Sequence, residues 1–275
     1  MPDLWSDLLG CLDLRALAAA PDPGAGGPAA GFEGRNQRLG YHRLFGGQLL
    51  AQFVRAAELA CPGKSVKSLH AQFPREGRPE EPVRYEVERH REGGTFATLT
   101  SRALQSPGVI ATASVSLHAA EEGPDHQTVP KAPPLLRPEH EARIDLLPWQ
   151  TRASADLDSA TSGPPELDLW MRIPETAPEH ATALTAYATD LTLIGTALRP
   201  VEGIGQRDAG TAFTSAVTSH TLWFHRPFRT GDWLLFRQHS PLTAHGRCFG
   251  RGDVLTEDGS LVASYAQEAL LRFKR

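Results

Sequence analysis

Hydrophobic and polar residues alternate with a period of two through the last quarter of the chain, residues 219–271. Such alternation is typical of antiparallel strands that bury one face. Gly246 and the pair Asp258-Gly259 predict turns between these strands. The last strand is predicted to have one apolar face, formed by Leu261, Ala263, Tyr265, Gln267, Ala269 and Leu271. Gln267 is the only amide on that face.

The first half of the chain combines helical and strand periodicities. Leucines at helical spacing predict a helix over residues 3–19, which the turn residues 21–24 end. A wide apolar stripe predicts a second helix between Gly46 and Pro62. The remaining patterns predict strands at residues 32–41, from residue 83 onwards, at 95–104 and at 109–117.

Two segments of similar sequence indicate an internal duplication. Phe73 precedes Ile110 by 37 residues, and Phe224 precedes Val262 by 38. We therefore predict two domains joined by a proline-rich linker, with the boundaries 1–120, 121–165 and 166–275. In each half, a sheet that must bury one face beside a single apolar helix is expected to curl around that helix, which makes the predicted fold class α+β.

The second half opens with a predicted strand over residues 167–173 and a predicted helix over 178–198. Thr176 and Glu179 have the spacing of a capping box at the start of this helix. Beyond the first turn Asp190 is its only charged residue, so the helix is expected to be buried nearly all round. A buried carboxylate costs several kcal/mol unless it is hydrogen-bonded or used. Asp190 is therefore either a group that satisfies a backbone amide or a catalytic base or water-binding group.

Composition and charge narrow the range of functions. The 275 residues carry a net charge of −4, so no general attraction to nucleic acid or to an anionic membrane is expected. Cys11, Cys61 and Cys248 are odd in number and lack metal or redox spacing, which favours a reducing compartment. With an acidic N-terminus and no apolar run of about 18 residues, the chain is predicted to be soluble and cytoplasmic.

Missing motifs exclude several classes of enzyme. The chain has no Gly-x-Ser-x-Gly elbow, Walker loop or dinucleotide fingerprint, which argues against a serine hydrolase, an NTPase and a Rossmann oxidoreductase. Four histidines of the last quarter lack an acidic or cysteine partner at ligand spacing, so we expect no metal and interpret them as strand-surface residues. They are His220, His225, His239 and His245.

Six short segments form a recognisable series along the chain. They are Phe45-Gly46-Gly47-Gln48, Ser68-Leu69-His70-Ala71-Gln72-Phe73, Tyr85-Glu86-Val87-Glu88-Arg89, Ala188-Thr189-Asp190-Leu191, Leu222-Trp223-Phe224-His225-Arg226-Pro227-Phe228 and Val262-Ala263-Ser264-Tyr265-Ala266-Gln267-Glu268. In sequence and order they resemble the acyl-CoA thioesterase II family, and the resemblance runs from about residue 35 to residue 272.

The resemblance implies a double-hotdog fold, in which two fused units each wrap an antiparallel sheet around a central helix. It also implies an enzyme of fatty acid metabolism that hydrolyses its substrate, acyl-CoA, to free acid and CoA without a cofactor. Hotdog sheets of this kind commonly pair at their edges, so we expect a homo-oligomer, a dimer or tetramer of double hotdogs.

The family positions one water molecule with an Asp on the second helix, a Gln on the last strand and a hydroxyl before the tryptophan strand. The resemblance gives the role of general base to Asp190 and the role of the amide to Gln267. The hydroxyl position falls on Val217, and the neighbouring Thr218 is the candidate third catalytic residue. Strand alternation places Ser219, rather than Thr218, on the face of Val217 unless a bulge intervenes.

Substrate binding is assigned to Gly46, Gly47 and Arg226. The glycine pair begins a helix whose backbone amides would face an oxyanion, although close packing explains the pair equally well. Arg226 is either a partner for CoA phosphates or a solvated strand residue.

There are two alternatives to an active thioesterase. Val217 favours a non-catalytic or weakly active acyl-CoA-binding protein, and Asp190 with Gln267 argues against it. A hotdog dehydratase needs an Asp and His pair near one helix start, which the sequence does not show.

Overall fold

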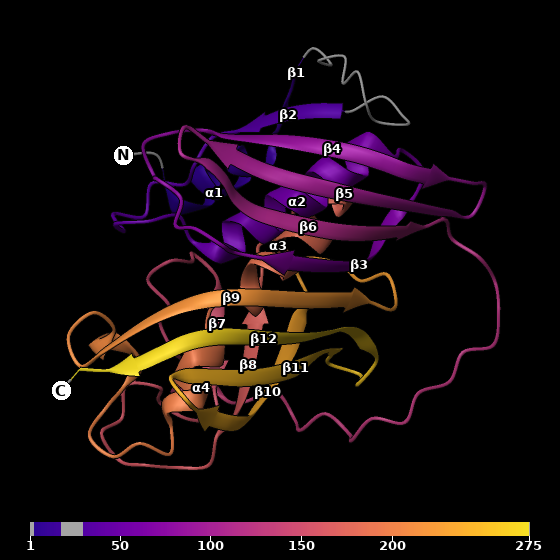
Figure 1. The fold of residues 1–275 in the computed structure, drawn as a ribbon. Helices are drawn as coiled ribbons and strands as arrows, with labels where there is room; N and C mark the ends of the chain where they lie inside the picture. The colour runs from indigo at the N-terminus through magenta and orange to yellow at the C-terminus, as the bar shows by residue number, and fades with distance from the viewer. Residues whose placement is uncertain (1–2, 18–29, 275) are drawn as a thin grey trace. The chain divides into compact units, whose positions relative to one another are not determined.

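The computed structural model describes residues 3–17 and 30–274. Contacts divide the chain into two units: unit 1 comprises residues 1–125 and 182–188, and unit 2 comprises residues 126–181 and 189–275. Along the chain, one order of elements occurs twice: a strand, a helical segment and then four strands (Figure 1). This is the arrangement that the duplication predicted.

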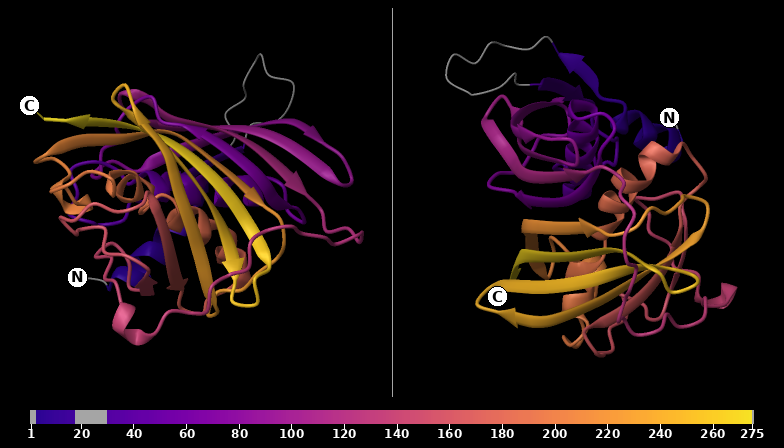
Figure 2. Two further views of the ribbon diagram at one scale, coloured as in Figure 1. Left: turned by 90° about the horizontal axis from the view of Figure 1, so that it is seen from below. Right: turned by 90° about the vertical axis from the view of Figure 1, so that its right-hand side faces the viewer.

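The sheet of unit 1 wraps around the long helix α2 (Gly46–Ala60), as Figure 2 shows. Its strand order is β1-β2-β4-β5-β6-β3. The strands are β1 (Arg15–Leu17), β2 (Ala30–Gly34), β3 (Ser65–Gln72), β4 (Val83–Glu92), β5 (Phe96–Gln105) and β6 (Gly108–His118). Leu50, Phe53 and Val54 of α2 are fully buried. The predicted second helix is therefore confirmed, and its apolar stripe forms the core of the unit.

The sheet of unit 2 has the strand order β9-β12-β11-β10-β8-β7. The strands are β7 (Gln150–Ala153), β8 (Glu166–Arg172), β9 (Phe213–Phe224), β10 (Trp233–Ala244), β11 (Arg247–Thr256) and β12 (Leu261–Phe273). The helical elements that precede β9 are η1 (Pro138–His140), η2 (Pro178–His180), α3 (Ala181–Thr189), α4 (Leu193–Leu198) and η3 (Gln206–Asp208). Strand for strand, this order matches unit 1, with β9 in the place of β3 and β12 in the place of β6.

The turns predicted in the last quarter are confirmed. His245 (φ 52°) and Gly246 (φ 74°) both adopt left-handed backbone conformations and join β10 to β11 in a two-residue hairpin. Gly259 (φ 87°) supplies the left-handed residue between β11 and β12. The burial of β12 alternates as predicted, and Gln267 is 3% exposed on its inner face.

Near the N-terminus, two predicted elements are shorter than expected. The helix α1 covers Leu4–Leu12 rather than residues 3–19, and the predicted turn at 21–24 lies outside the described residues. The first strand ends at Gly34 rather than at residue 41. Beyond the end of this strand, the backbone N–H groups of Gln37 and Arg38 donate to side chains and not to a neighbouring strand.

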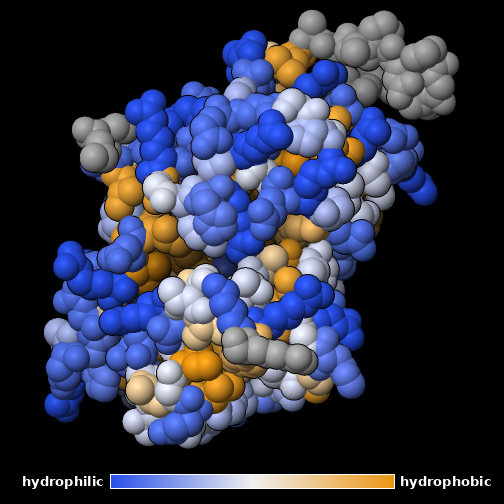
Figure 3. Space-filling view, turned by 60° about the vertical axis from the view of Figure 1, so that its left-hand side comes forward, coloured by the Kyte–Doolittle hydropathy of each residue, from blue (hydrophilic) through white to orange (hydrophobic). Residues whose placement is uncertain are grey.

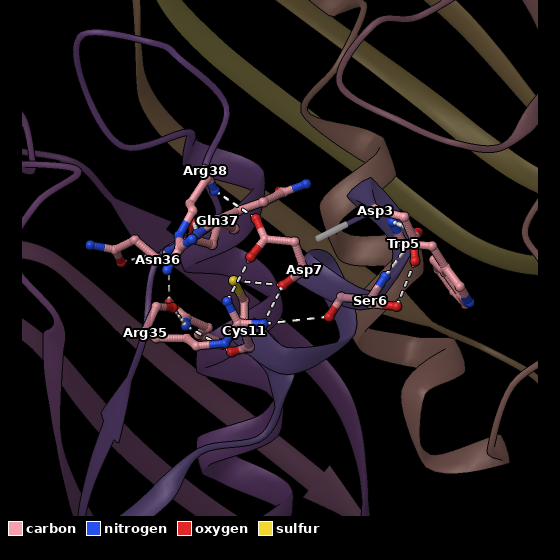
Figure 4. Close-up of polar contacts among 11 residues, drawn as sticks. Asp3, Trp5, Ser6, Asp7, Cys11, Arg35, Asn36, Gln37 and Arg38 are labelled. Carbon is pink, nitrogen blue, oxygen red and sulfur yellow. Dashed lines mark hydrogen bonds and ion pairs between the residues drawn. The ribbon is translucent and has the colours of Figure 1, made fainter. Parts of the chain in front are cut away.

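Figure 4 shows these contacts around α1. The backbone N–H of Arg38 donates to Asp7 Oδ2 at 2.7 Å, and that of Gln37 donates to Gln48 Oε1 at 2.9 Å. The guanidinium of Arg35 donates to Asp7 Oδ1 at 2.6 Å. Asp7 is 2% exposed, so this buried carboxylate anchors α1 to the irregular segment that follows β2.

The continuous helix predicted over residues 178–198 is wrong in two respects. The helix is interrupted between α3 and α4, and the capping box is not formed. The first turn instead has Ala177 as its N-cap, without a side-chain hydrogen bond to the cap. The backbone N–H of Thr176 donates to the hydroxyl of Thr230, at 3.1 Å, so a tertiary contact displaces the local motif.

The proline-rich segment after β6 covers the outer face of the sheet in unit 2. Val129, Ala132 and Leu135 pack on a cluster that contains Trp170 and Leu235. Exposed large hydrophobic residues come from separate elements: Leu4, Tyr41, Leu59, Phe96, Trp223, Leu242 and Phe273. On the face drawn in Figure 3, hydrophobic atoms form small patches among hydrophilic ones. Within the described ranges, no helix has the length and apolar character needed to cross a membrane.

Candidate active site

Asp190 lies in the break between α3 and α4 of the helical segment. Its side chain is only 2% exposed. Thr192 holds the break open, because its hydroxyl donates to Gln238 Oε1 on β10 at 3.0 Å. The hydroxyl of Thr196 donates to the same oxygen at 2.8 Å. These hydrogen bonds to the sheet outweigh the preference of this segment for a continuous helix. They fix the carboxylate of Asp190 at the end of a helix.

Gln267 reaches the same region from β12. Its cross-strand partner on β9 is His220, and both side chains lie on the inner face of the sheet. Gln267 Oε1 lies 2.9 Å from His220 Nδ1. The same ring nitrogen lies 3.9 Å from Asp190 Oδ1, which is beyond a hydrogen bond. One imidazole therefore brings together the two side chains that the sequence assigned to catalysis.

His220 corrects the sequence-based interpretation of the histidines, because it is fully buried and not on the strand surface. Its Nε2 lies 3.0 Å from the hydroxyl of Thr189, and its ring stacks parallel to Tyr265 with centroids 6.1 Å apart. Burial lowers the pKa of His220 to about 4, although the hydrogen bond to Gln267 acts in the opposite direction. His220 is thus neutral at pH 7. By contrast, His225 and His245 are exposed.

A β-bulge at Thr218 explains why His220 faces inward. Val217 pairs with Ala269, whereas Ser219 pairs with Glu268, so Thr218 is an additional residue in β9. Thr218 is exposed, and its hydroxyl donates to the backbone carbonyl of Glu268 at 3.0 Å. The structure therefore does not bring Thr218 to the Asp190 and Gln267 pair. Ser219 also leaves the face of Val217, contrary to the expectation from simple alternation.

The predicted substrate-binding residues belong to α2 and to the segment after β9. Gly46 and Gly47 begin α2 in unit 1. A Cβ at Gly47 would lie 2.5 Å from the backbone oxygen of Tyr187, so close packing requires this glycine. Arg226 donates to Gln127 Oε1 and to the backbone oxygen of Leu261, both at 2.9 Å, and thereby binds the linker to the sheet.

A metal site needs several His, Cys, Asp or Glu side chains around one point. In residues 3–17 and 30–274, no cluster of three or more His, Cys, Asp or Glu side chains has the arrangement of a metal site. Cys11, Cys61 and Cys248 are buried free thiols. The chemistry available at the cluster is therefore that of one carboxylate, one amide, one neutral imidazole and one hydroxyl.

The fold defines the class of protein. Two units of one topology, each an antiparallel sheet packed on helices, form a double hotdog. A hotdog-fold protein of Alicyclobacillus acidocaldarius matches 98% of this chain and 98% of its own length, with a TM-score of 0.71 and 18% sequence identity. The predicted fold class is confirmed.

Comparisons with known proteins then give the family. Residues 35–118 match the acyl-CoA thioesterase N-terminal domain, and residues 118–271 match the acyl-CoA thioesterase C-terminal domain. Acyl-CoA thioesterase 2 of Haemophilus influenzae is 32% identical over 88% of this chain and 92% of its own length. Human acyl-coenzyme A thioesterase 8 is 30% identical over 88% of this chain and 85% of its own. The chain belongs to the acyl-CoA thioesterase family.

A solved structure of a relative agrees with this assignment. The acyl-CoA thioesterase II of Mycobacterium marinum has a TM-score of 0.75 and 30% identity, and the match covers 97% of both chains. The resemblance inferred from six short segments is confirmed.

Proposed function

We propose that this chain hydrolyses acyl-CoA to free acid and CoA with a water molecule that Asp190 activates and Gln267 holds. The observation that carries the proposal is the burial of this carboxylate and this amide around one neutral imidazole. A carboxylate that is 2% exposed needs a function or a partner to offset its desolvation. The family and the names of its members supply the substrate class.

In the proposed reaction, Asp190 takes a proton from water while the water oxygen bonds to the thioester carbonyl carbon. The carbonyl π electrons move to the oxygen, which becomes an oxyanion. When this intermediate collapses, the bond from carbon to sulfur breaks and the CoA sulfur leaves with the electron pair. The proton held by Asp190 then passes to the sulfur. A positioned base of this kind contributes about 10² to 10⁴ in rate.

The oxyanion needs hydrogen-bond donors, and backbone amides at a helix start are suited to this. Gly46 and Gly47 remain our proposal for a substrate contact, since they are the first residues of a helix of 15 residues. Arg226 remains the proposed partner for CoA phosphates. Its bonds to Gln127 and Leu261 mean that phosphate binding would compete with the anchoring of the linker.

One observation favours a second candidate, a weakly active or non-catalytic acyl-CoA-binding protein. Val217 is aliphatic and pairs with the buried Ala269, on the same face of the sheet as Gln267. Thr218, the third catalytic residue expected from the sequence, donates its hydroxyl hydrogen bond to the Glu268 carbonyl instead. A site without this hydroxyl would bind substrate and turn it over slowly.

The two candidates differ in the rate at which thiol is released. We propose an assay of the wild-type protein with acyl-CoAs in water enriched in oxygen-18. Hydrolysis predicts that thiol and free acid form in equal amounts and that the acid gains a single labelled oxygen. Acyl-CoA binding seen by calorimetry, without release of thiol, would instead establish the non-catalytic candidate.

Three further features are proposed with the function. The domain boundaries 1–120, 121–165 and 166–275 remain our proposal for two repeats and a linker. Three buried free thiols support a location in the cytoplasm. The outermost strands of the described sheets, β1 and β7, each pair with a single strand, which supports edge pairing in a homo-oligomer. A role in fatty acid metabolism follows if the substrates are fatty acyl-CoAs.

A further inference from the structure

The His220 imidazole lies within 4 Å of polar atoms of Gln267, Thr189 and Asp190, yet the proposed reaction assigns it no role. Its Nδ1 lies 2.9 Å from Gln267 Oε1, and its Nε2 lies 3.0 Å from Thr189 Oγ1. Thr189 directly precedes Asp190, whose Oδ1 is 3.9 Å from the ring. The imidazole thus bridges the helix that carries the proposed base and the strand that carries the proposed amide.

The first repeat shows that the fold does not need polar groups here. β3 and β6 pair with the same irregularity as β9 and β12, so that Leu69 opposite Val115 takes the place of His220 opposite Gln267. Leu69 and Val115 are 0% and 2% exposed. An apolar pair therefore fills this position of the hotdog core. Histidine and glutamine occur together in one repeat and are both absent from the equivalent position of the other.

The neutral ring fixes the direction of each hydrogen bond. A neutral imidazole has one N–H donor and one acceptor nitrogen, and an amide oxygen only accepts. Nδ1–H therefore donates to Gln267 Oε1, and Nε2 accepts from the hydroxyl of Thr189. The amide nitrogen of Gln267, which this bond does not use, is the donor end of the side chain.

From this geometry we infer that His220 is a positioning residue, which holds the Gln267 amide so that its N–H groups point at the reacting water or thioester oxygen. This inference rests on the proposed function. It assigns Gln267 the role of a donor and not of an acceptor. Without the imidazole, the amide is free to rotate and to present its oxygen to the same place.

The test compares four variants in the release of CoA thiol: His220→Leu, Gln267→Val, the combination of both, and His220→Asn. The combined variant recreates the apolar pair of the first repeat and is expected to fold. His220→Leu removes one hydrogen bond, so we expect kcat to fall about tenfold or more while KM stays within about twofold. His220→Asn keeps a donor near the place of Nδ1 and is expected to restore most of kcat.

The combined variant separates positioning from a merely structural role. If His220 acts through Gln267, kcat of the combined variant equals that of Gln267→Val alone, whereas its melting temperature exceeds that of His220→Leu. The inference is overturned if His220→Leu keeps the wild-type kcat, or if it lowers kcat by the same factor with and without Gln267.

The same variants keep this inference distinct from the proposed function. Wild-type activity of Gln267→Val would refute the proposed function, whereas loss of activity in Gln267→Val but not in His220→Leu would refute only the role of His220. If His220→Leu does not fold, the inference is tested by comparing kcat of His220→Asn with kcat of His220→Gln. We then expect kcat to be about tenfold higher for the Asn variant, because only Asn keeps the donor at Nδ1, and equal values overturn the inference.

Discussion

Replacing His220 and Gln267 by the apolar pair of the first repeat should change how stability depends on pH. Burial lowers the pKa of His220 from its ordinary value of 6.5 to about 4. The titratable groups that face the ring are Asp190, at 3.9 Å, and Tyr265, which stacks on it. Between pH 6.5 and pH 4 the unfolded chain binds a proton that the folded chain does not bind. Stability must therefore fall as the pH falls through this window.

The size of the effect follows from the two pKa values. A difference of 2.5 units, from 6.5 to about 4, corresponds to about 3 kcal/mol lost by pH 4. This is a large part of the roughly 5 to 15 kcal/mol that stabilises a typical domain. In the variant His220→Leu with Gln267→Val, this contribution is absent, because leucine does not titrate.

The assay is urea unfolding at several pH values between 7 and 4, followed by circular dichroism. The wild type should lose about 3 kcal/mol more than the apolar variant over this range. His126→Asn, which removes an exposed histidine of the linker, is the matched control and should keep the wild-type pH dependence. Equal pH dependence in the wild type and the apolar variant would show that His220 is not a buried neutral group.

Three other predictions concern β9 and assembly. Val217→Thr should raise kcat about tenfold, because a hydroxyl on the face next to Gln267 adds one hydrogen bond to the attacking water. Thr218→Val should leave kcat unchanged, because the hydroxyl of Thr218 donates to the carbonyl of Glu268. If kcat is instead unchanged in Val217→Thr and lost in Thr218→Val, Thr218 supplies the catalytic hydroxyl. Light scattering at micromolar concentration should give the mass of a dimer or tetramer, and a monomeric mass would count against edge pairing.

The sequence predicted the features of the site that depend on local periodicity. Gln267 stood out because period two placed one amide on an apolar strand face, and the structure buries it there. Asp190 stood out as the only charge in an apolar helix, and its side chain is buried. Both signals come from consecutive residues of a single element.

The features that the sequence did not predict depend on contacts between elements. The break at Asp190 is stabilised by hydrogen bonds that Thr192 and Thr196 donate to Gln238, a residue of β10. The bulge at Thr218 exists only in the pairing of β9 with β12, so strand alternation counted from Val217 placed the following residues on the wrong faces. A signal for His220 was present, because Leu222 is two residues away and buried on the same face.

The central claim is that Asp190 activates water for attack on acyl-CoA, and kcat of Asp190→Asn tests it most directly. Asparagine keeps the shape of the side chain but cannot take the proton. We predict that kcat falls by about 10² or more while folding and acyl-CoA binding are kept. Asp168→Asn is the control and should keep the wild-type rate. It removes a carboxylate of β8 that lies 3.5 Å from the guanidinium of Arg237. An unchanged kcat in Asp190→Asn would contradict the account.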